Sequence, residues 1–396
     1  MLRIYLDHNA TTPVHPAVLE TMLPYFGGEF GNPSSAHRFG QRASQGIEAA
    51  REAVAALIGA RPSEIVFTSG GTEADNTAIF GVMRHALRKR KSGGGPLHLI
   101  TTAIEHDAVL NACRALEDRG VSVTYIPAGR DGVVSSDAIR AAIRPETVLI
   151  SVMHANNEIG TLQPVDEIGG IAAEAGIRFH TDAVQSAGKV SIDVIRLGVD
   201  LLTISAHKFG GPKGAGALFV RRGVEIDPLL HGGQNERGRR AGTENVAAIV
   251  GLGKACELAR GDLAEASAGI SELRDRLENG LLARIRDARI NGDPARRVPN
   301  TSNLIFPGVE SESLIIALDL SGLACSAGAA CSSGAVDPSH VLTAIGLTPA
   351  EARASVRLSL GRTNTSEEID TALELIPAAI ARQRNVASDR EMAAAP

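Results

Sequence analysis

Residues 201–214 read LLTISAHKFGGPKG, an apolar run followed by small, polar and glycine residues. The run predicts a short buried strand from Leu201 to Ile204, and the glycines predict a turn soon after it. Lys208 therefore lies just past a strand end, which is where an open α/β sheet places its ligands. A lysine held there in low dielectric can lose its proton, and the neutral amine can then form a Schiff base.

Ser205 and His207 flank this lysine with hydrogen-bond donors that suit a phosphate. A Schiff-base lysine beside phosphate donors suggests pyridoxal 5′-phosphate (PLP) as cofactor. A lone lysine after a strand is more often a surface residue. The interpretation therefore depends on whether the rest of the chain supplies a partner for each part of that cofactor.

The composition is that of a globular protein large enough for two domains, with 396 residues, 44% hydrophobic and 21% charged. The chain has no apolar run of about 18 residues, and its start is too short and too quickly acidic for a signal peptide. The net charge of -5 gives no reason to expect a nucleic acid or an anionic membrane as partner. With four cysteines and no secretion signal, we expect a cytoplasmic protein without structural disulfides.

Predicted strands alternate with predicted helices up to about residue 220, which favours an α/β fold with a mainly parallel sheet. We expect a large domain over residues 16–258. A smaller α+β domain would combine residues 1–15 with residues 259–396. Within it, residues 385–396 are expected to be frayed.

Several polar residues follow predicted strands and match parts of PLP. Gly71 and Thr72 open a helix after a strand and could bind an anion through their backbone amides and hydroxyl. His106 could stack on a planar ring, because the chain has no Trp and only 3 Tyr and 9 Phe, although a helix-start role is more common. Asp182 could pair with a protonated pyridine nitrogen, although a cap or ion pair is the more common fate of such an Asp. Gln185 could donate to the ring oxygen.

The second domain contains a segment without large side chains, residues 324–334, which includes Cys325 and Cys331. Such a segment packs little and should be mobile, so Cys331 could carry a group between two places; a tight buried turn is the alternative. Cys325 follows an apolar run and should be partly buried and inert. Arg357 lies in an apolar strand, where its partner is either a substrate α-carboxylate or an Asp/Glu side chain. Asn32 stands in a turn cluster and could cap it or reach a ligand.

The set of motifs resembles PLP-dependent cysteine desulfurases of the NifS/IscS type, within the class-V aminotransferases. The resemblance covers nearly the whole chain in order. It is carried by residues 5–13, 68–76 (TSGGTEADN), 105–106, 154–160 (HANNEIG), 180–185 (HTDAVQ), 205–211 (SAHKFGG), 236–243, 328–332 and 355–362. It implies a fold-type-I PLP-dependent transferase, normally a homodimer, that takes sulfur from L-cysteine and leaves L-alanine.

The resemblance also implies a role for each matched residue. Lys208 would be the Schiff-base lysine, Cys331 the nucleophile that accepts sulfur, and His106 the stacking and acid–base residue. The cofactor contacts would be Gly71, Thr72, His106, Asn157, Asp182, Gln185, Ser205, His207, Lys208 and Thr243, with Thr243 reaching the partner subunit's phosphate. Asn32 and Arg357 would hold the substrate carboxylate. No resident metal is expected, although Cys331 could meet an iron–sulfur cluster transiently.

Two features differ from the family pattern. The tail after Arg384 does not resemble the ending of the housekeeping enzyme, where a scaffold protein docks, and Gly328-Ala329-Ala330 stands where Gly-Ser-Ala is usual. The sulfur acceptor, an iron–sulfur scaffold or another protein, therefore stays open, and a role in nitrogenase assembly is one possibility. The alternatives are a selenocysteine lyase or an aminotransferase of the same fold, and a catalytically idle assembly subunit.

Overall fold

The computed structural model describes residues 3–90, 95–327 and 338–394. At its centre is a seven-stranded sheet with the order β2-β8-β7-β6-β5-β3-β4. β8 is antiparallel to both of its neighbours, and the other adjacent strands are parallel, so the predicted mainly parallel sheet is confirmed. The strands are β2 (Ile65–Thr68), β3 (His98–Thr102), β4 (Ser122–Ile126), β5 (Thr147–Ser151), β6 (Arg178–Asp182), β7 (Leu201–Ser205) and β8 (Gly216–Val220).

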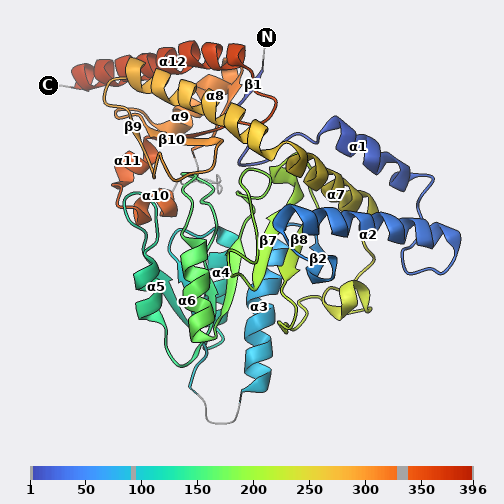
Figure 1. Ribbon diagram of the computed structural model, residues 1–396. Helices are drawn as coiled ribbons and strands as arrows, with labels where there is room; N and C mark the ends of the chain where they lie inside the picture. Colours follow the sequence, from blue (N-terminus) through green and yellow to red (C-terminus); the bar gives the residue numbers. More distant parts are fainter. Residues whose placement is uncertain (1–2, 91–94, 328–337, 395–396) are drawn as a thin grey trace.

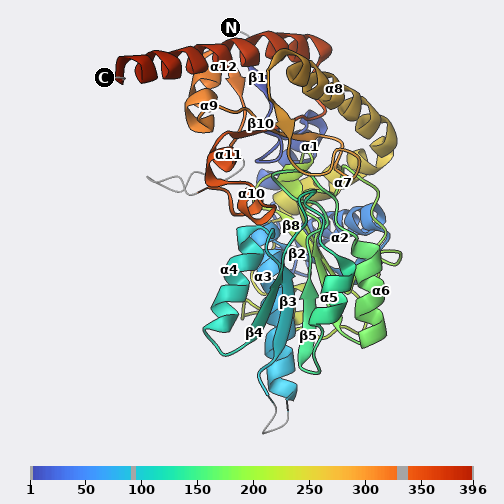
Figure 2. The same cartoon turned by 90° about the vertical axis from the view of Figure 1, so that its left-hand side faces the viewer.

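Both faces of this sheet are covered by helices, which explains why its strands are apolar at successive positions. Neighbouring residues of a strand point to opposite faces. Leu201 accordingly packs with the core under α3 and α4, whereas Leu202 packs with the core under α2, α6 and α7. Figure 2 shows the layers, with the sheet between α4 and α6. The helices are α2 (Arg38–Ile58), α3 (Gly71–Lys89), α4 (Asp107–Glu117), α5 (Ser136–Ala142), α6 (Val165–Ala175) and α7 (Val246–Gly261).

A second, smaller unit lies at the carboxyl edge of the large sheet, at the top of Figure 1. It contains the antiparallel sheet β12-β10-β9 and the parallel pair β1-β11. Its elements are β1 (Ile4–Tyr5), α8 (Leu263–Arg284), β9 (Arg289–Ile290), β10 (Thr301–Ile305), α9 (Ser311–Leu320), β11 (Leu323–Ala324), α10 (His340–Ala344), α11 (Pro349–Arg353), β12 (Ser355–Ser359) and α12 (Ser366–Ala394). Its apolar side chains, including Ile4 and Leu6, form a core of their own. This separate core supports our proposed division into residues 16–258 and residues 1–15 with 259–396.

The N-terminal segment joins the two units. The amide of Asn9 donates to Ser359 Oγ of the small unit at 3.0 Å, and the amide of Thr12 donates to the carbonyl of His207 in the large unit at 2.8 Å. After this arm come α1 (Pro16–Met22) and the short 3₁₀ helix η1 (Leu23–Phe26). Further 3₁₀ helices are η2 (Pro62–Glu64), η3 (Ala206–Lys208) and η4 (Asn235–Gly238).

The end of the chain differs from the expectation. α12 continues to Ala394, so the prediction of a frayed tail from residue 385 is wrong as far as residue 394. This stretch contains good helix formers such as alanine, arginine and glutamate, whose propensity favours a helical backbone. Within the described part of the chain, no helix is both long enough and apolar enough to cross a membrane.

Candidate active site

The candidate site lies where the parallel strands of the large sheet end. Asp182 closes β6 and Ser205 closes β7. The carboxyl ends of parallel strands meet at one edge, so residues far apart in sequence gather there. They surround a cavity of about 230 Å³. Its lining comprises Gly71, Thr72, Asp75, His106, Met153, Ala155, Asn157, Asp182, Val184, Gln185, Ser205, His207 and Lys208, which includes every predicted cofactor contact except Thr243.

Lys208 ends the short helix η3 directly after β7, as the sequence predicted. Its Nζ donates to the carbonyls of Asn9 at 2.7 Å and Ala10 at 2.8 Å. Burial and the positive charge of Arg357 lower the pKa of Lys208 to about 8, against an opposing contribution from Asp182. The amine is therefore easier to deprotonate than a surface lysine, as a nucleophile toward an aldehyde must be.

One end of the cavity has the properties of a phosphate site. Helix α3 begins at Gly71, so its free backbone amides and the positive end of its dipole lie at the cavity. Ser205 Oγ is buried there without a hydrogen-bond partner in the described residues. A Cβ on Gly71 would lie 2.9 Å from Val184 Cγ2, so the backbone passes where a side chain would not fit. An orphaned hydroxyl beside a helix N-terminus fits a phosphate group.

Asp182 also lines the cavity and lies near two other buried acids, Asp75 and Glu105. Its Oδ1 accepts from the amide of Val184 at 2.8 Å, and burial raises its pKa. Behind it, burial raises the pKa of Glu105 to about 8, and burial followed by the charge of Asp182 raises the pKa of Asp75 well above its ordinary value. Burial therefore makes both Glu105 and Asp75 harder to ionise than surface carboxyl groups. A cation placed against Asp182, such as a protonated pyridine nitrogen, would favour its ionised form.

His106 and Asn157 present free polar atoms to the same cavity. His106 caps α4, and its Nδ1 accepts from the amide of Ala108 at 3.1 Å. The predicted helix-start role and the cavity position are thus both present, and in a neutral ring the proton is on Nε2. Asn157 uses its backbone carbonyl for protein contacts, whereas its buried Oδ1 has no partner within the described chain.

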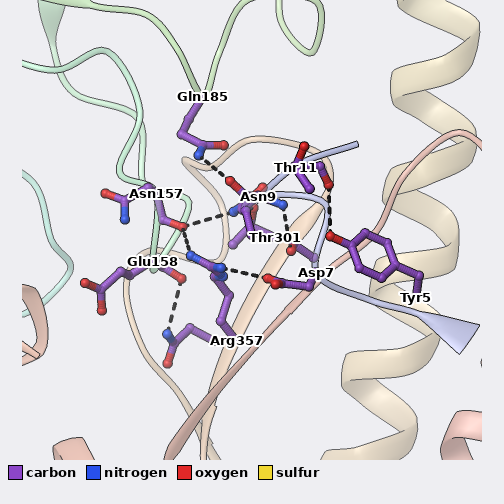
Figure 3. A network of polar contacts seen from close by, with 12 residues as sticks. Tyr5, Asp7, Asn9, Thr11, Asn157, Glu158, Gln185, Thr301 and Arg357 are labelled. Carbon is purple, nitrogen blue, oxygen red and sulfur yellow. Dashed lines mark hydrogen bonds and ion pairs between the residues drawn. The ribbon is translucent and has the colours of Figure 1, made fainter. Parts of the chain in front are cut away.

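Arg357 comes from β12 and reaches the edge of this site from the small unit. Its Nη2 pairs with Asp7 Oδ1 at 2.8 Å, and its Nη1 donates to the carbonyl of Asn157 at 3.0 Å. Figure 3 shows the guanidinium between these two groups. The ion pair considered from the sequence is therefore present. Nε remains buried without a partner among the described residues.

Two other predicted site residues do not line the cavity of their own chain. Asn32 is exposed, and its Oδ1 accepts from the amide of Ser34 at 2.9 Å, which is the predicted turn role. Thr243 lines a separate cavity of about 190 Å³ with Ser69. Cys331 lies outside the described residues.

Both described ends of the segment that contains Cys331 are attached beside the site. Ser326 exchanges backbone hydrogen bonds with Arg357, at 3.2 and 2.7 Å. After the segment, Ser339 Oγ donates to Glu158 Oε2 at 2.6 Å, and His340 Nε2 lies 2.9 Å from the carbonyl of Glu105. Cys325, just before the segment, is buried, and burial raises the pKa of its thiol to about 12. Its predicted burial is confirmed.

Asn9 is a site residue that the sequence reasoning did not identify. Its carbonyl accepts from Lys208 and from Gln185 Nε2, at 2.7 and 3.0 Å. Its Nδ2 donates to Thr301 Oγ1 at 2.8 Å and to the carbonyl of Asn157 at 3.1 Å (Figure 3). The sequence signal is that residues 5–13 belong to the motifs of the family resemblance, and the partners of Asn9 cannot be deduced from that motif.

Comparison with known proteins agrees with this geometry. The model of the aminotransferase class-V family matches residues 4–372. The chain belongs to the class-V aminotransferase family. It is 52% identical to the cysteine desulfurase IscS of Methanosarcina thermophila, over 97% of this chain and 93% of that protein. It is 50% identical to the cysteine desulfurase IscS of Clostridium botulinum, over 97% of this chain and 96% of that protein.

Two solved structures are similar over most of the chain. A NifS-like protein superposes with a TM-score of 0.89 at 38% identity, covering 96% of this chain and 100% of its own. SspA in complex with cysteine superposes with a TM-score of 0.79 at 40% identity, covering 91% of this chain and 100% of its own. The predicted resemblance to NifS/IscS-type cysteine desulfurases is confirmed, and so is the predicted fold. In the described residues, no group of three or more His, Cys, Asp or Glu side chains is placed to hold a metal ion.

Proposed function

We propose that the protein is a PLP-dependent cysteine desulfurase, which converts L-cysteine to L-alanine and passes the sulfur to an acceptor protein through Cys331. The observation that carries the proposal is Lys208, whose pKa is lowered to about 8, facing a cavity that also holds Asp182 and the start of α3. The curated relatives are named cysteine desulfurases, and one similar structure is a complex with cysteine.

PLP supplies an aldehyde that binds an amine and a ring that accepts electrons from a neighbouring carbon. Lys208 would hold the cofactor, and Asp182 would keep the ring nitrogen protonated. Gly71, Thr72, Ser205 and His207 would bind the phosphate. Asn157 and Gln185 would contact the ring, with His106 on its face. The unpartnered oxygens of Ser205 and Asn157 support this assignment.

The substrate would bind between Lys208 and Arg357. Arg357 would take the α-carboxylate, with its buried Nε available and Asp7 as the group to be displaced. The uncharged Lys208 amine would then accept the α-proton. The thiolate of Cys331 would attack the substrate sulfur: an S–S bond forms, and the C–S bond breaks with its electron pair going to carbon. That carbon is protonated as alanine is released, and Cys331 keeps the extra sulfur as a persulfide.

The reach of Cys331 supports its assignment. It follows Ser326 by five residues, and Ser326 is bonded to the backbone of Arg357. An extended chain covers about 3.3–3.6 Å per residue, so the thiol can travel roughly 17 Å from that anchor. That distance is enough for movement between a cavity and the protein surface.

The test of the proposal uses the purified protein with PLP. We expect a yellow protein, because a lysine–PLP adduct absorbs visible light, and we expect borohydride to attach the cofactor to the peptide that contains Lys208. A Lys208→Ala variant should bind no PLP covalently. Attachment to another lysine would contradict the proposal.

We also propose a homodimer. Large apolar side chains between 49% and 69% exposed lie on α1, on η1, at the start of α2 and in the loop between η1 and α2: Leu19, Leu23, Phe26, Phe30 and Phe39. A second copy is the partner we propose for this patch, since Asn32 and Thr243 lie away from the cavity of their own chain and could complete a neighbour's. The mass in solution should be twice 41.3 kDa; an active monomer would contradict this.

For the cellular role we propose a cytoplasmic enzyme that supplies sulfur for iron–sulfur cluster assembly. The IscS names of the relatives support a supply role, and the persulfide is a form of sulfur that a protein acceptor can take over by thiol exchange. This role is tested by incubating the sulfur-loaded enzyme with candidate scaffold proteins and measuring, by mass spectrometry, whether the scaffold gains the mass of sulfur.

A further inference from the structure

Lys189 is a buried lysine that the proposed reaction does not use. It follows Gln185 by four residues, and only 8% of its surface is exposed. Its Nζ donates to Gln185 Oε1 at 2.9 Å and to Asn9 Oδ1 at 3.1 Å. Both partners are neutral amide oxygens. Buried lysines are rare unless they are paired, so this one needs an explanation.

These two bonds fix the orientation of two amides. Because Gln185 Oε1 accepts from Lys189, the amide nitrogen of Gln185 lies on the other side, where it donates to the carbonyl of Asn9 at 3.0 Å. Asn9 Oδ1 accepts from Lys189 and from Asn300 Nδ2, at 3.1 and 2.9 Å. Asn9 Nδ2 is thereby left to donate to Asn157 and Thr301.

The two oriented amides lie directly beside the proposed chemistry. The carbonyl of Asn9 accepts from Lys208 Nζ as well as from Gln185 (Figure 3 shows the Gln185 contact). Gln185 itself lines the cofactor cavity. Lys189 therefore contacts the cavity-lining amide of Gln185 directly. It is connected to the reactive Lys208 through Asn9, which accepts a hydrogen bond from each of the two lysines.

We propose that Lys189 is a positioning residue, which holds the Gln185 amide and the Asn9 arm in the orientation that the cofactor cavity requires. Each amide nitrogen already donates to a backbone carbonyl, that of Asn9 or that of Asn157. Lys189 adds a donor to both amide oxygens, so a flipped amide would set its own N–H groups against the lysine and lose both contacts. The inference rests on the proposed cofactor site and adds a residue outside the cavity lining to it.

The electrostatic surroundings explain how a lysine can serve here. Burial, with the positive charges of Lys208 and Arg357, lowers the pKa of Lys189 well below its ordinary value. His8, which also faces it, is buried, and its pKa is lowered to about 4, so it adds no charge near neutral pH. A lysine amine can donate two hydrogen bonds whether or not it is protonated, which is the number that Gln185 and Asn9 require.

The test compares Lys189→Met with Lys254→Met in protein reconstituted with PLP. Lys254 is partly exposed and pairs with Glu257, so the same substitution there is a matched control. We expect Lys189→Met to weaken PLP binding about three- to tenfold, the range for one or two lost hydrogen bonds, and to change the absorption maximum of the bound cofactor. Lys254→Met should change neither.

A double mutant tests whether Lys189 acts through Gln185. In a Gln185→Ala background, Lys189→Met should have less than half of its single-mutant effect on PLP affinity, because the amide it orients is gone. Equal effects in both backgrounds, or a Lys189→Met protein with the affinity and spectrum of the Lys254→Met control, would overturn the proposal. Lys189→Gln keeps a neutral donor and should recover part of the loss; it also serves if the Met variant does not fold.

The charge state of Lys189 is tested in the protein without cofactor. The unfolded chain binds a proton on Lys189 more tightly than the folded chain, so folding is favoured as pH rises between the lowered pKa and 10.5. Relative to Lys189→Met, the folding equilibrium constant of the apoprotein should rise by up to about tenfold per pH unit in urea titrations between pH 8 and 9.5. The same pH dependence in both proteins would contradict an uncharged Lys189. If the unaltered protein binds no PLP at all, the proposed function fails, whereas this titration still decides the charge state.

Discussion

The carboxyl edge of the large sheet and the segment around Cys331 are held in different ways. At the sheet edge, Asp182 and Ser205 are fixed by the strands that end at them, and Lys208 follows within three residues. Residues 328–337 lie outside the described residues, and the chain on either side of them is attached at Ser326 and at Ser339. In the proposed reaction, breaking a bond needs fixed groups, whereas passing sulfur from a buried cavity to another protein needs a cysteine that can reach both. We propose that the sheet edge serves the first task and Cys331 the second.

The two cysteines of the small unit offer the sharpest test of this contrast. Cys331→Ala should reduce sulfide release to background, because no thiolate remains to take the sulfur, while L-cysteine still changes the absorption of the bound cofactor. Cys325→Ala should keep most of the activity, since burial raises its pKa to about 12 and makes it a poor nucleophile. Parallel assays of sulfide and absorption check both variants. An inactive Cys325→Ala beside a normal Cys331→Ala would reverse the assignment.

At the carboxyl edge of the large sheet, Asp182→Asn should retain PLP but lose about 10²–10³-fold in turnover. This is the usual scale for removing one oriented electrostatic group. The neutral amide no longer favours a protonated ring nitrogen, so the ring accepts electrons less readily. Alanine formation at saturating L-cysteine is the measurement, with bound PLP quantified in the same samples. Turnover equal to that of the unaltered protein would reduce Asp182 to a cap for Val184.

A smaller effect should appear with pH. Lys208 can accept a proton only when it is uncharged, and its pKa is lowered to about 8. Turnover should therefore rise about tenfold per unit at pH values below 8 and level off above it, because the neutral fraction increases with pH until the lysine is fully deprotonated. Initial rates from pH 6 to 9.5 check this. A rate that is flat across that range would exclude Lys208 as the proton acceptor.

The sheet edge could be predicted from the sequence because each of its groups follows a recognisable local pattern. Asp182, Ser205 and Lys208 come at or just after the ends of predicted strands, and Gly71 opens a helix that follows a strand, so the pattern of strand ends places them at one edge. Asn9 and Lys189 carry no such pattern. Asn9 meets Thr301, 292 residues away, and Lys189 meets Asn9, 180 residues away, so their contacts depend on the tertiary fold.

Two further limits of the sequence have physical causes. Asn32 and Thr243 match the family's site by motif, yet they do not line the cavity of their own chain, and the proposed homodimer would place them at a neighbour's. The pair between Asp7 and Arg357 was only one of two alternatives, since a motif shows that an arginine is buried but not what it contacts.

The central claim is tested most directly by incubating the PLP-loaded protein with L-cysteine and a thiol, and measuring sulfide and alanine together. We expect the protein to form sulfide and alanine in equal amounts over many turnovers, and the Cys331→Ala variant to form neither product. Two results would contradict this expectation. One is the formation of pyruvate in place of alanine, and the other is the release of alanine and sulfide from Cys331→Ala at undiminished rates.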